Sequence, residues 1–483
     1  MLFNSIQFLI FFPIITILYF TLPKKIRWFL LLVSSSIFYM AFVPKYILIL
    51  GVTIVIDFFA GIFIDKMRGN RKRIFLIVSI LTNVGILFVF KYFNFFNENI
   101  TRLASILQWD YPISSLSILL PIGLSFHTFQ SMSYIIEVYR GKQKPEKHFG
   151  IYALYVMYYP QLVAGPIERP QNMLWQFHKE HKFDINRIAD GLKLMVWGFF
   201  KKLVIADNMA LVVNAGYKFP NDLSGLSLLI ATYFFAIQIY CDFSGYTDIA
   251  RGASRIMGIE LMENFKRPYL SKSISEFWRN WHISLTGWFK DYVYIPLGGN
   301  RCGKWKWCRN ILIIFLLSGL WHGANWTYIT WGALNGLYLV IAILTKTIRL
   351  KVSHTCRIER VPVINKSIKI LITLNLICFT WIFFRADSIS SALSIIKKIF
   401  TDFTLNLNFN AVGISTYQIV LNCCVILFLI IVEILQYSQP ISERLYKKPL
   451  IFRWGIYYIV LFLIIILGVY DVVDKSPFIY FQF

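Results

Sequence analysis

The chain has 483 residues, of which 57% are hydrophobic, 18% aromatic and only 15% charged. A soluble protein of this length carries about 25% charged residues, so the composition excludes an ordinary soluble protein and indicates a membrane protein. Its 49 Lys and Arg against 25 Asp and Glu give a net charge of +24. Because the basic residues cluster in short segments between apolar runs, we interpret the excess as the positive-inside pattern and as contact with anionic lipid, and expect no nucleic-acid partner.

Apolar runs without Asp, Glu, Lys or Arg recur along the whole chain. A helix needs about 20 residues to cross the hydrocarbon of a bilayer, and most of the runs reach or approach this length. They are Phe3–Pro23, Trp28–Pro44, Ile74–Phe90, Tyr111–Ile136, Leu223–Cys241, Asn310–Thr345, Ile370–Phe384, Leu405–Val432 and Gly455–Tyr470, joined by Tyr46–Ile64 with one interior acid and by the less regular Gly191–Ala215. We therefore predict an all-α polytopic membrane protein with about 10 to 13 transmembrane helices.

The amino-terminal helices can be oriented from their loop charges. The first run has no basic segment before it and no small-residue cleavage site after it, so we expect a retained helix rather than a removed signal peptide. Basic clusters follow the first, third and fifth expected helices, at residues 24–27, 66–73 and 140–147. Placing all three clusters in the cytoplasm puts the amino terminus on the extracytoplasmic side of the membrane.

One integral-membrane domain is expected over residues 1–483, because no repeat, low-complexity tract or linker separates a soluble part. We divide it into amino-terminal helices (1–147), a central part (148–345) and carboxy-terminal helices (346–483). Within the central part, residues 149–167 are charge-free but rich in Tyr, Pro and Gly, with basic segments on both sides, which predicts a re-entrant segment. Residues 253–309 are basic and interleaved with aromatics, which predicts amphipathic helices at the cytoplasmic interface.

A histidine interrupts the longest charge-free run, in SGLWHGANW at residues 318–326. A helix over residues 310–345 would extend roughly 54 Å, nearly twice the hydrocarbon thickness, so we expect a break beside Gly319 and Gly323. An ionisable group at membrane depth indicates a functional site, and a break beside the imidazole of His322 predicts a small wet niche. A histidine that packs by hydrogen-bonding across helices is the alternative that these residues leave open.

A second histidine, His282, lies in FWRNWHISLTGWFKDYVYIPLGGNR at residues 277–301. Three tryptophans alternate there with three basic residues: Trp278, Trp281 and Trp288 with Arg279, Lys290 and Arg301. This spacing favours an interfacial aromatic belt with basic partners. A binding surface built around the histidine is the alternative.

A third motif, YCDFSGYTDIARG at residues 240–252, places Asp242 and Asp248 at the end of an apolar run. Ser244 lies between them, but the context is not that of a nucleophile elbow. We therefore expect a helix end at which the two carboxylates accept hydrogen bonds from backbone amides. Elsewhere the sequence contains no nucleotide-binding glycine loop and no metal-ligand spacing, and the cysteines suggest no disulfide framework.

Taken together, seven ordered blocks resemble the membrane-bound O-acyltransferases, in the branch typified by the membrane subunit of alginate O-acetyltransferase. The blocks run from about residue 158 to the carboxyl terminus. They are YYPQLVAGPIERP, GLKLMVWGFFKKLVIADNMA, YCDFSGYTDIARG, FWRNWHISLTGWFKDYVYIPLGGNR, LLSGLWHGANWTYITWGALNG, FFRADS and FIYFQF.

The resemblance implies a ring of tilted helices around a central funnel or tunnel, with His322 as the catalytic histidine and His282 at the second signature position. It also implies an acyl donor from the cytoplasm, acetyl-CoA, with no bound cofactor and no metal. The acceptor is a glycan outside the membrane, reached through a separate extracytoplasmic acetyltransferase of the SGNH-hydrolase type. The remaining candidate substrate-binding residues are Trp321, Asn325, Arg279, Lys290, Arg301 and Asp242, of which the three basic ones would attract the phosphates of the donor.

Two other functions stay open at this point. One is O-acylation of a cell-wall polymer, either peptidoglycan or teichoic acid. The other is a transporter or flippase without chemistry of its own, which intramembrane histidines and a re-entrant segment would also suit.

Overall fold

The computed structural model describes residues 1–355, 361–402, 404–439, 441–470 and 478–479 of the chain. All regular structure within these residues is helical, which confirms the predicted all-α class. Seven helical segments in this part are long and apolar enough to cross a membrane, and the shorter apolar helix Ile6–Thr21 accompanies them. The seven are Pro44–Lys66, Gly69–Ile106, Gly225–Ile256, Trp326–Leu344, Pro362–Arg385, Thr416–Leu435 and Leu450–Leu467.

The expected range of 10 to 13 also included apolar runs that fold into shorter or interrupted helices. The run at Tyr111–Ile136 is the clearest difference, because residues 109–121 carry no helix and the helix begins only at Leu124. Pro112 and Pro121 remove backbone donors, and Gly123 adopts a left-handed conformation with φ of 77° directly before that helix. The absence of charge therefore did not predict a helix over residues 109–121, most of which are exposed.

The structure divides into two compact units, and each is described by itself. Unit 1 comprises Met1–Met195 with Thr247–Glu263, and unit 2 comprises Val196–Tyr246 with Asn264–Phe483. Two helices run through the boundaries: α10 (Ile185–Phe199) and α12 (Gly225–Ile256).

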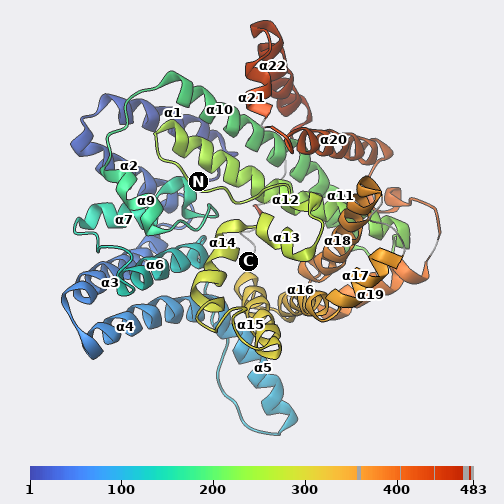
Figure 1. Ribbon diagram of the computed structural model, residues 1–483, viewed down its shortest axis with the longest axis horizontal. Helices are drawn as coiled ribbons and strands as arrows, with labels where there is room; N and C mark the ends of the chain where they lie inside the picture. Colours follow the sequence, from blue (N-terminus) through green and yellow to red (C-terminus); the bar gives the residue numbers. More distant parts are fainter. Residues whose placement is uncertain (356–360, 403, 440, 471–477, 480–483) are drawn as a thin grey trace. The chain divides into compact units, whose positions relative to one another are not determined.

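Unit 1 contains the amino-terminal helices (Figure 1). They are α1 (Ile6–Thr21), α2 (Lys24–Met40), the 3₁₀ turn η1 (Pro44–Tyr46), α3 (Ile47–Lys66), α4 (Gly69–Leu87), the π-helix η2 (Phe88–Tyr92), α5 (Phe93–Ile106), α6 (Leu124–Tyr139), α7 (Phe149–Met157), α8 (Tyr159–Leu162) and α9 (Pro170–His178). Helices α3, α4 and α6 pack against one another.

Asp57, the one acid within the apolar run Tyr46–Ile64, has partners in this three-helix packing. The buried carboxylate of Asp57 accepts hydrogen bonds from Ser79 Oγ at 2.5 Å and from Asn83 Nδ2 at 2.9 and 3.0 Å. A buried carboxylate without such donors would be costly, so these bonds explain how α3 tolerates it. The segment predicted to be re-entrant forms the two short helices α7 and α8, and every residue from Gly150 to Ile167 is buried.

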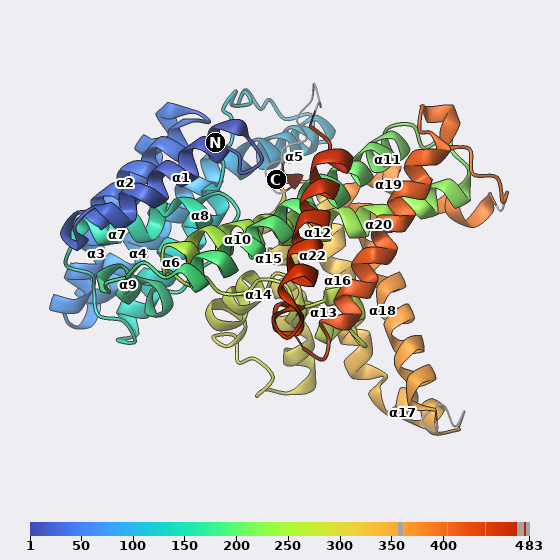
Figure 2. The same ribbon diagram turned by 90° about the horizontal axis from the view of Figure 1, so that it is seen from above.

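Unit 2 contains the rest of the described helices (Figure 2). They are the π-helix η3 (Phe200–Ala206), α11 (Asp207–Lys218), η4 (Pro268–Leu270), α13 (Ile274–Asn280), α14 (Ile283–Phe289), the π-helix η5 (Lys290–Tyr294), α15 (Lys304–His322), α16 (Trp326–Leu344), α17 (Lys346–Thr355), α18 (Pro362–Arg385), α19 (Ile389–Thr401), η7 (Phe409–Val412), α20 (Thr416–Leu435), α21 (Ile441–Tyr446) and α22 (Leu450–Leu467).

The predicted break in the long charge-free run is confirmed. Helix α15 ends at His322, and α16 begins at Trp326 after a three-residue connection. Asn325 caps α16, because its side-chain oxygen accepts a hydrogen bond from the backbone N–H of Thr327 at 3.0 Å. Gly319 lies inside α15 rather than at the break, and it lets the two helices approach closely: a Cβ there would collide with the Tyr328 carbonyl.

Candidate active site

His322 occupies the last position of α15 and is enclosed by aromatic rings. Its ring centroid lies 4.9 Å from that of Trp321, 5.0 Å from that of Trp331 on α16 and 5.4 Å from that of Phe384 on α18. The three interplanar angles are 81°, 88° and 72°, so the rings meet edge to face. Only 3% of the residue is exposed. Aromatic side chains thus surround this histidine, and the wet niche stays a prediction.

His282 precedes α14 and has an unusual backbone conformation. Its φ is 44° and its ψ is 55°, in the left-handed region that residues other than glycine rarely adopt. The carbonyl of Asn264 accepts a hydrogen bond from the N–H of Ile283 at 3.0 Å, and its side-chain oxygen accepts bonds from the N–H and Oγ of Ser284 at 3.1 and 2.9 Å. These bonds hold the start of α14 in place, so the strained backbone at His282 is imposed by its surroundings, as is common at functional sites.

The structure brings the two histidines into one aromatic cluster. The ring of Trp321 lies 6.0 Å from His282 and 4.9 Å from His322, so it contacts both. On its other side, His282 packs against Phe243 of α12 at 4.7 Å. Forty residues separate the histidines in the chain, yet they share this one tryptophan. We call Trp321, His282 and His322 the histidine pair site.

The prediction that the second segment forms an interfacial aromatic belt is wrong. Trp278, Trp281 and Trp288 are all buried, whereas tryptophans in a belt would face the membrane surface. Trp281 stacks on Phe277, with centroids 5.5 Å apart and planes at 15°, and it also packs 5.2 Å from Trp381. The alternation of Trp with basic residues arises because the tryptophans turn into the core of unit 2 and the charges turn outward.

The other predicted site residues lie at different depths. Arg279, Lys290 and Arg301 are exposed, so the structure places their charges at the surface rather than in the aromatic cluster. Asn325 is half-buried, and both ends of its amide are engaged: the oxygen caps α16, and Nδ2 donates to the carbonyl of Asp387 at 3.4 Å.

The expected helix end at residues 240–252 is wrong, because this whole motif lies inside α12. The buried carboxylate of Asp242 instead pairs with the ammonium of Lys202 at 2.6 Å and accepts a hydrogen bond from the backbone N–H of Ile479 at 2.8 Å. Asp248, one and a half turns further on, lies 3.6 Å from Arg251. The partners of Asp242 come from 40 residues upstream and 237 residues downstream, so no local sequence pattern could reveal them.

A wide helical turn positions the lysine. Lys202 belongs to the π-helix η3, where the backbone N–H of Asp207 bonds to the Lys202 carbonyl five residues earlier. The same spacing brings the Asp207 carboxylate to 2.8 Å from the Lys202 ammonium. Two buried carboxylates thus flank one buried ammonium, which supplies the compensation that a buried charge requires. Neighbouring Lys201 donates a hydrogen bond to Ser244 at 3.0 Å, and Ser244 is therefore part of this buried polar group.

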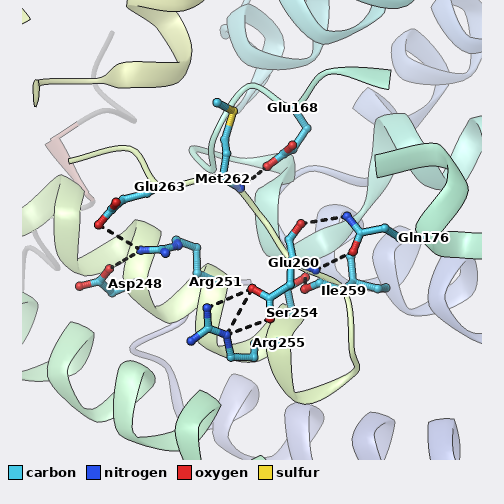
Figure 3. Close-up of polar contacts among 10 residues, drawn as sticks. All are labelled: Glu168, Gln176, Asp248, Arg251, Ser254, Arg255, Ile259, Glu260, Met262 and Glu263. Atoms are coloured by element: carbon cyan, nitrogen blue, oxygen red, sulfur yellow. Dashed lines mark hydrogen bonds and ion pairs between the residues drawn. The ribbon is translucent and has the colours of Figure 1, made fainter. Parts of the chain in front are cut away.

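In unit 1, a loop after α12 is fixed by carboxylates (Figure 3). Glu168 accepts hydrogen bonds from the backbone N–H of Met262 and from Asn172 Nδ2, both at 2.6 Å, and its burial raises the pKa of the carboxyl to about 7. Glu260 pairs with Arg255 at 3.0 Å at the surface. Glu168 sits in the first of the resembling blocks, and the sequence gave no reason to select it from its neighbours.

These features define an integral-membrane helical protein with two buried, titratable side chains in one aromatic cluster. The membrane-bound O-acyltransferase family matches residues 148–384, a range that includes both histidines. The chain belongs to the membrane-bound O-acyltransferase family and is an O-acyltransferase. The resemblance seen in the sequence is thereby confirmed, and the alternative of a transporter without chemistry is set aside.

Named relatives cover most of the chain. It is 35% identical over 452 residues to the probable alginate O-acetylase AlgI of Pseudomonas aeruginosa, covering 92% of this chain and 84% of that protein. It is 36% identical over 394 residues to the peptidoglycan O-acetyltransferase of Helicobacter pylori, covering 76% and 72%. The teichoic acid D-alanyltransferase of Bacillus subtilis is 31% identical over 232 residues, covering 45% of this chain and 58% of that protein.

Sequence reasoning missed the residues that enclose the site. Trp331 and Phe384 form walls around His322, and Lys202 compensates Asp242. The two lysines in FFKKLVIAD did carry a usable signal, because adjacent cations inside an apolar segment need buried partners. Of the closing block FIYFQF, only Phe478 and Ile479 are described; Tyr480 to Phe483 lie outside the described residues.

Proposed function

We propose that this protein moves an acetyl group from a cytoplasmic donor, acetyl-CoA, across the bacterial cell membrane for O-acetylation of an extracellular polysaccharide. A separate extracytoplasmic acetyltransferase of the SGNH-hydrolase type completes the transfer. The identities of 34–38% to several alginate O-acetylases support an anionic exopolysaccharide as the acceptor class. The positive-inside pattern supports an extracytoplasmic amino terminus. The family's ring of helices around a funnel stays a prediction.

The observation that carries the catalytic assignment is the histidine pair site. His322 and His282 come from separate blocks and contact the same indole. Aromatic walls exclude bulk water, which strengthens every polar interaction made inside. A structural histidine on an apolar helix would need no second histidine beside the same ring.

The chemistry follows from an imidazole near neutral pH. An alcohol is a poor nucleophile, and a neutral imidazole at His322 takes its proton as the oxygen attacks the thioester carbonyl. The tetrahedral intermediate then collapses, the carbon–sulfur bond breaks, and the thiolate leaves with the proton that His322 returns. His282 orients the pair or donates a hydrogen bond to the developing oxyanion, and such assistance is typically worth about 10²- to 10⁴-fold in rate.

The surface charges have a separate role in this proposal. Arg279 directly follows Trp278, and Lys290 lies two residues after Trp288. Both are exposed, so their charges can attract the phosphates of the donor without entering the aromatic cluster. With 3% of His322 exposed, the reactants reach it only when neighbouring side chains move apart. Trp321 contacts both histidines and is the side chain most directly placed to line that path.

Peptidoglycan is the second candidate acceptor. The relative named as a peptidoglycan O-acetyltransferase is 36% identical, as close as several of the alginate O-acetylases. The chemistry at the histidines would be unchanged, because in this proposal the separate extracytoplasmic enzyme, and not His322, transfers the acetyl group to the polymer.

The deciding experiment replaces His322 with Ala and measures acetyl groups on the purified exopolysaccharide and on peptidoglycan. We expect acetylation of one polymer to fall by at least about 100-fold while the amount of polymer stays unchanged. His354→Ala is the matched control, since His354 is exposed and far along the chain from both signature blocks. Wild-type acetylation in the His322 variant at equal membrane abundance would remove the proposal, and the polymer that loses acetyl groups identifies the acceptor.

A further inference from the structure

A basic pocket lies within unit 1, apart from the histidine pair site. It opens where the start of α2 meets the end of α9, and its enclosed space is small, about 20 Å³, so a bound group would rest at the opening. Three cations line it, Lys24 and Arg27 from α2 and Lys179 from the residue after α9. Nothing in the proposed acyl transfer uses this pocket.

The arginine of the pocket is held in a fixed position. Arg27 donates from Nε to the carbonyl of Leu22 at 3.1 Å and from Nη1 to the carbonyl of His181 at 2.7 Å. Its guanidinium carbon lies 5.1 Å from the centroid of the Tyr19 ring, which adds a cation–π contact. These two carbonyls and the Tyr19 ring are uncharged, so they fix the orientation of the Arg27 guanidinium without neutralising its positive charge. A pre-organised guanidinium of this kind suits binding of a planar or tetrahedral oxyanion.

The cations of the pocket have no acidic partners. Within the part of the chain that the structure describes, no carboxylate lies at ion-pair distance from Lys24, Arg27 or Lys179. Glu180 is an acid in the lining, and it makes no ion pair with them. Three like charges gathered at one opening repel one another, so the arrangement is stabilised when an anion joins them.

The pKa of the neighbouring His181 is affected by the same positive charges. Burial lowers the pKa of His181, and the charges of Arg187, Lys179 and Arg27 lower it further, although a hydrogen bond to the Gln176 carbonyl opposes the shift. A cation at His181 would be repelled by the groups that line the pocket. The site therefore favours anions and disfavours additional positive charge.

The backbone and the apolar lining fit the same ligand. Helix α2 begins after Pro23, and no side chain that the structure describes caps its first-turn N–H groups. The rings of Trp28 and Phe177 complete the wall and provide an apolar surface beside the charges. A phosphate needs the charged side, and the group that carries it can lie on the aromatic side.

We propose that this pocket binds a phosphate group, with Lys24, Arg27 and Lys179 contacting its oxygens. The phosphate belongs either to the headgroup of an anionic phospholipid or to a soluble diphosphate in the cytoplasm, and both present the same chemistry to these cations. The inference does not depend on the acyl-transfer function, because its readout is binding.

The test compares ligand-dependent thermal stabilisation of the detergent-solubilised full chain. The probes are phosphatidylglycerol, phosphatidylcholine and inorganic pyrophosphate, each titrated separately. Lys24→Gln with Lys179→Gln removes two exposed cations of the pocket and leaves the buried bonds of Arg27 in place. The matched control, Lys66→Gln with Lys142→Gln, removes two exposed lysines elsewhere in unit 1 and gives the same net charge.

We expect the pocket variant to need at least about tenfold more phosphatidylglycerol or pyrophosphate for half-maximal stabilisation, while the control needs the wild-type amount. Stabilisation by phosphatidylglycerol but not pyrophosphate identifies a lipid headgroup, and the reverse identifies a soluble diphosphate. If both double variants need equally more of the probe, net charge alone attracts the anion, and the proposal is overturned. It is also overturned if neither phosphatidylglycerol nor pyrophosphate stabilises the wild-type protein, because the pocket then binds no phosphate. If the pocket variant unfolds, Lys24→Arg with Lys179→Arg restores the charges and is expected to bind like wild type.

Discussion

Glu168 supplies a quantitative prediction, because its carboxyl is buried, outside the membrane-spanning segments and hydrogen-bonded in the loop of Figure 3. Its pKa rises from the ordinary value of 4.5 to about 7 in the folded protein. A raised pKa means that the folded state binds the proton more tightly. The stability that results is complete below the ordinary pKa and is lost as the pH rises through about 7.

The magnitude follows from the two pKa values. Between about pH 5.5 and about pH 8.5, proton linkage removes about 2 kcal/mol of unfolding free energy from the wild-type protein. Glu168→Gln has no titrating proton, so its stability lacks this decline. The amide retains one acceptor oxygen for the two donors at Met262 and Asn172, which costs about 1–3 kcal/mol at acid pH. The stability gap between wild type and variant should therefore narrow as the pH rises.

The assay is chemical denaturation of the solubilised protein at both pH values. Glu260→Gln makes the same carboxyl-to-amide change in the loop that Glu168 contacts, but its partner Arg255 is at the surface, so the variant should lose at most about 1 kcal/mol. It should also keep the pH-dependence of wild type. If the unfolding free energies of wild type and Glu168→Gln change equally between the two pH values, titration of Glu168 is not the cause of the decline. A wild-type protein that becomes more stable at the higher pH while Glu168→Gln does not would also refute it.

Two further substitutions test the packing around the site. Asp242→Asn should lower the unfolding free energy by about 3 kcal/mol, because its buried lysine partner keeps only one carboxylate. The control Asp190→Asn, at an exposed pair, should lower it by at most about 1 kcal/mol. Similar losses for the two variants in chemical denaturation would contradict the buried ion network. Gly319→Ala should destabilise the protein by about 1–3 kcal/mol and reduce acetylation, because the new methyl group meets the backbone of Tyr328. The control Gly85→Ala, at an open position in a helix, should be neutral or slightly stabilising. A neutral Gly319→Ala would show that α15 and α16 are not tightly packed.

The sequence predicted features that depend on composition and length. The low charge predicted a helical membrane protein, and the excess length of residues 310–345 predicted a break, which the structure places at Gly323. His322 could be selected because an imidazole in an apolar segment has no reason to be there unless something compensates or uses it. These predictions need only the chain and the thickness of a bilayer. His282 lies in a basic segment and could be selected only through the family resemblance.

The features that the sequence did not predict depend on partners far away in the chain. Trp281 had the spacing of a membrane-interface residue, but packing against Trp381 turns it inward. Asp242 had the local context of a helix end, but its partners are Lys202 and the backbone at Ile479. Hydropathy and local spacing report how a residue meets its near neighbours, so they could not distinguish a surface tryptophan from a core one or a capping carboxylate from an ion-paired one.

The wide turn at Phe200–Ala206 makes the length of the chain matter as much as its composition. Lys202 and Asp207 are five residues apart, a spacing that an ordinary α-helix would place on different faces, since each residue turns the chain by about 100°. Removing a single residue from this segment would regularise the helix and leave the two charges at the four-residue spacing of an ordinary helical ion pair, yet it would turn all of α11 by about 100° relative to the residues before it. The extra residue therefore determines which face of α11 packs against α20.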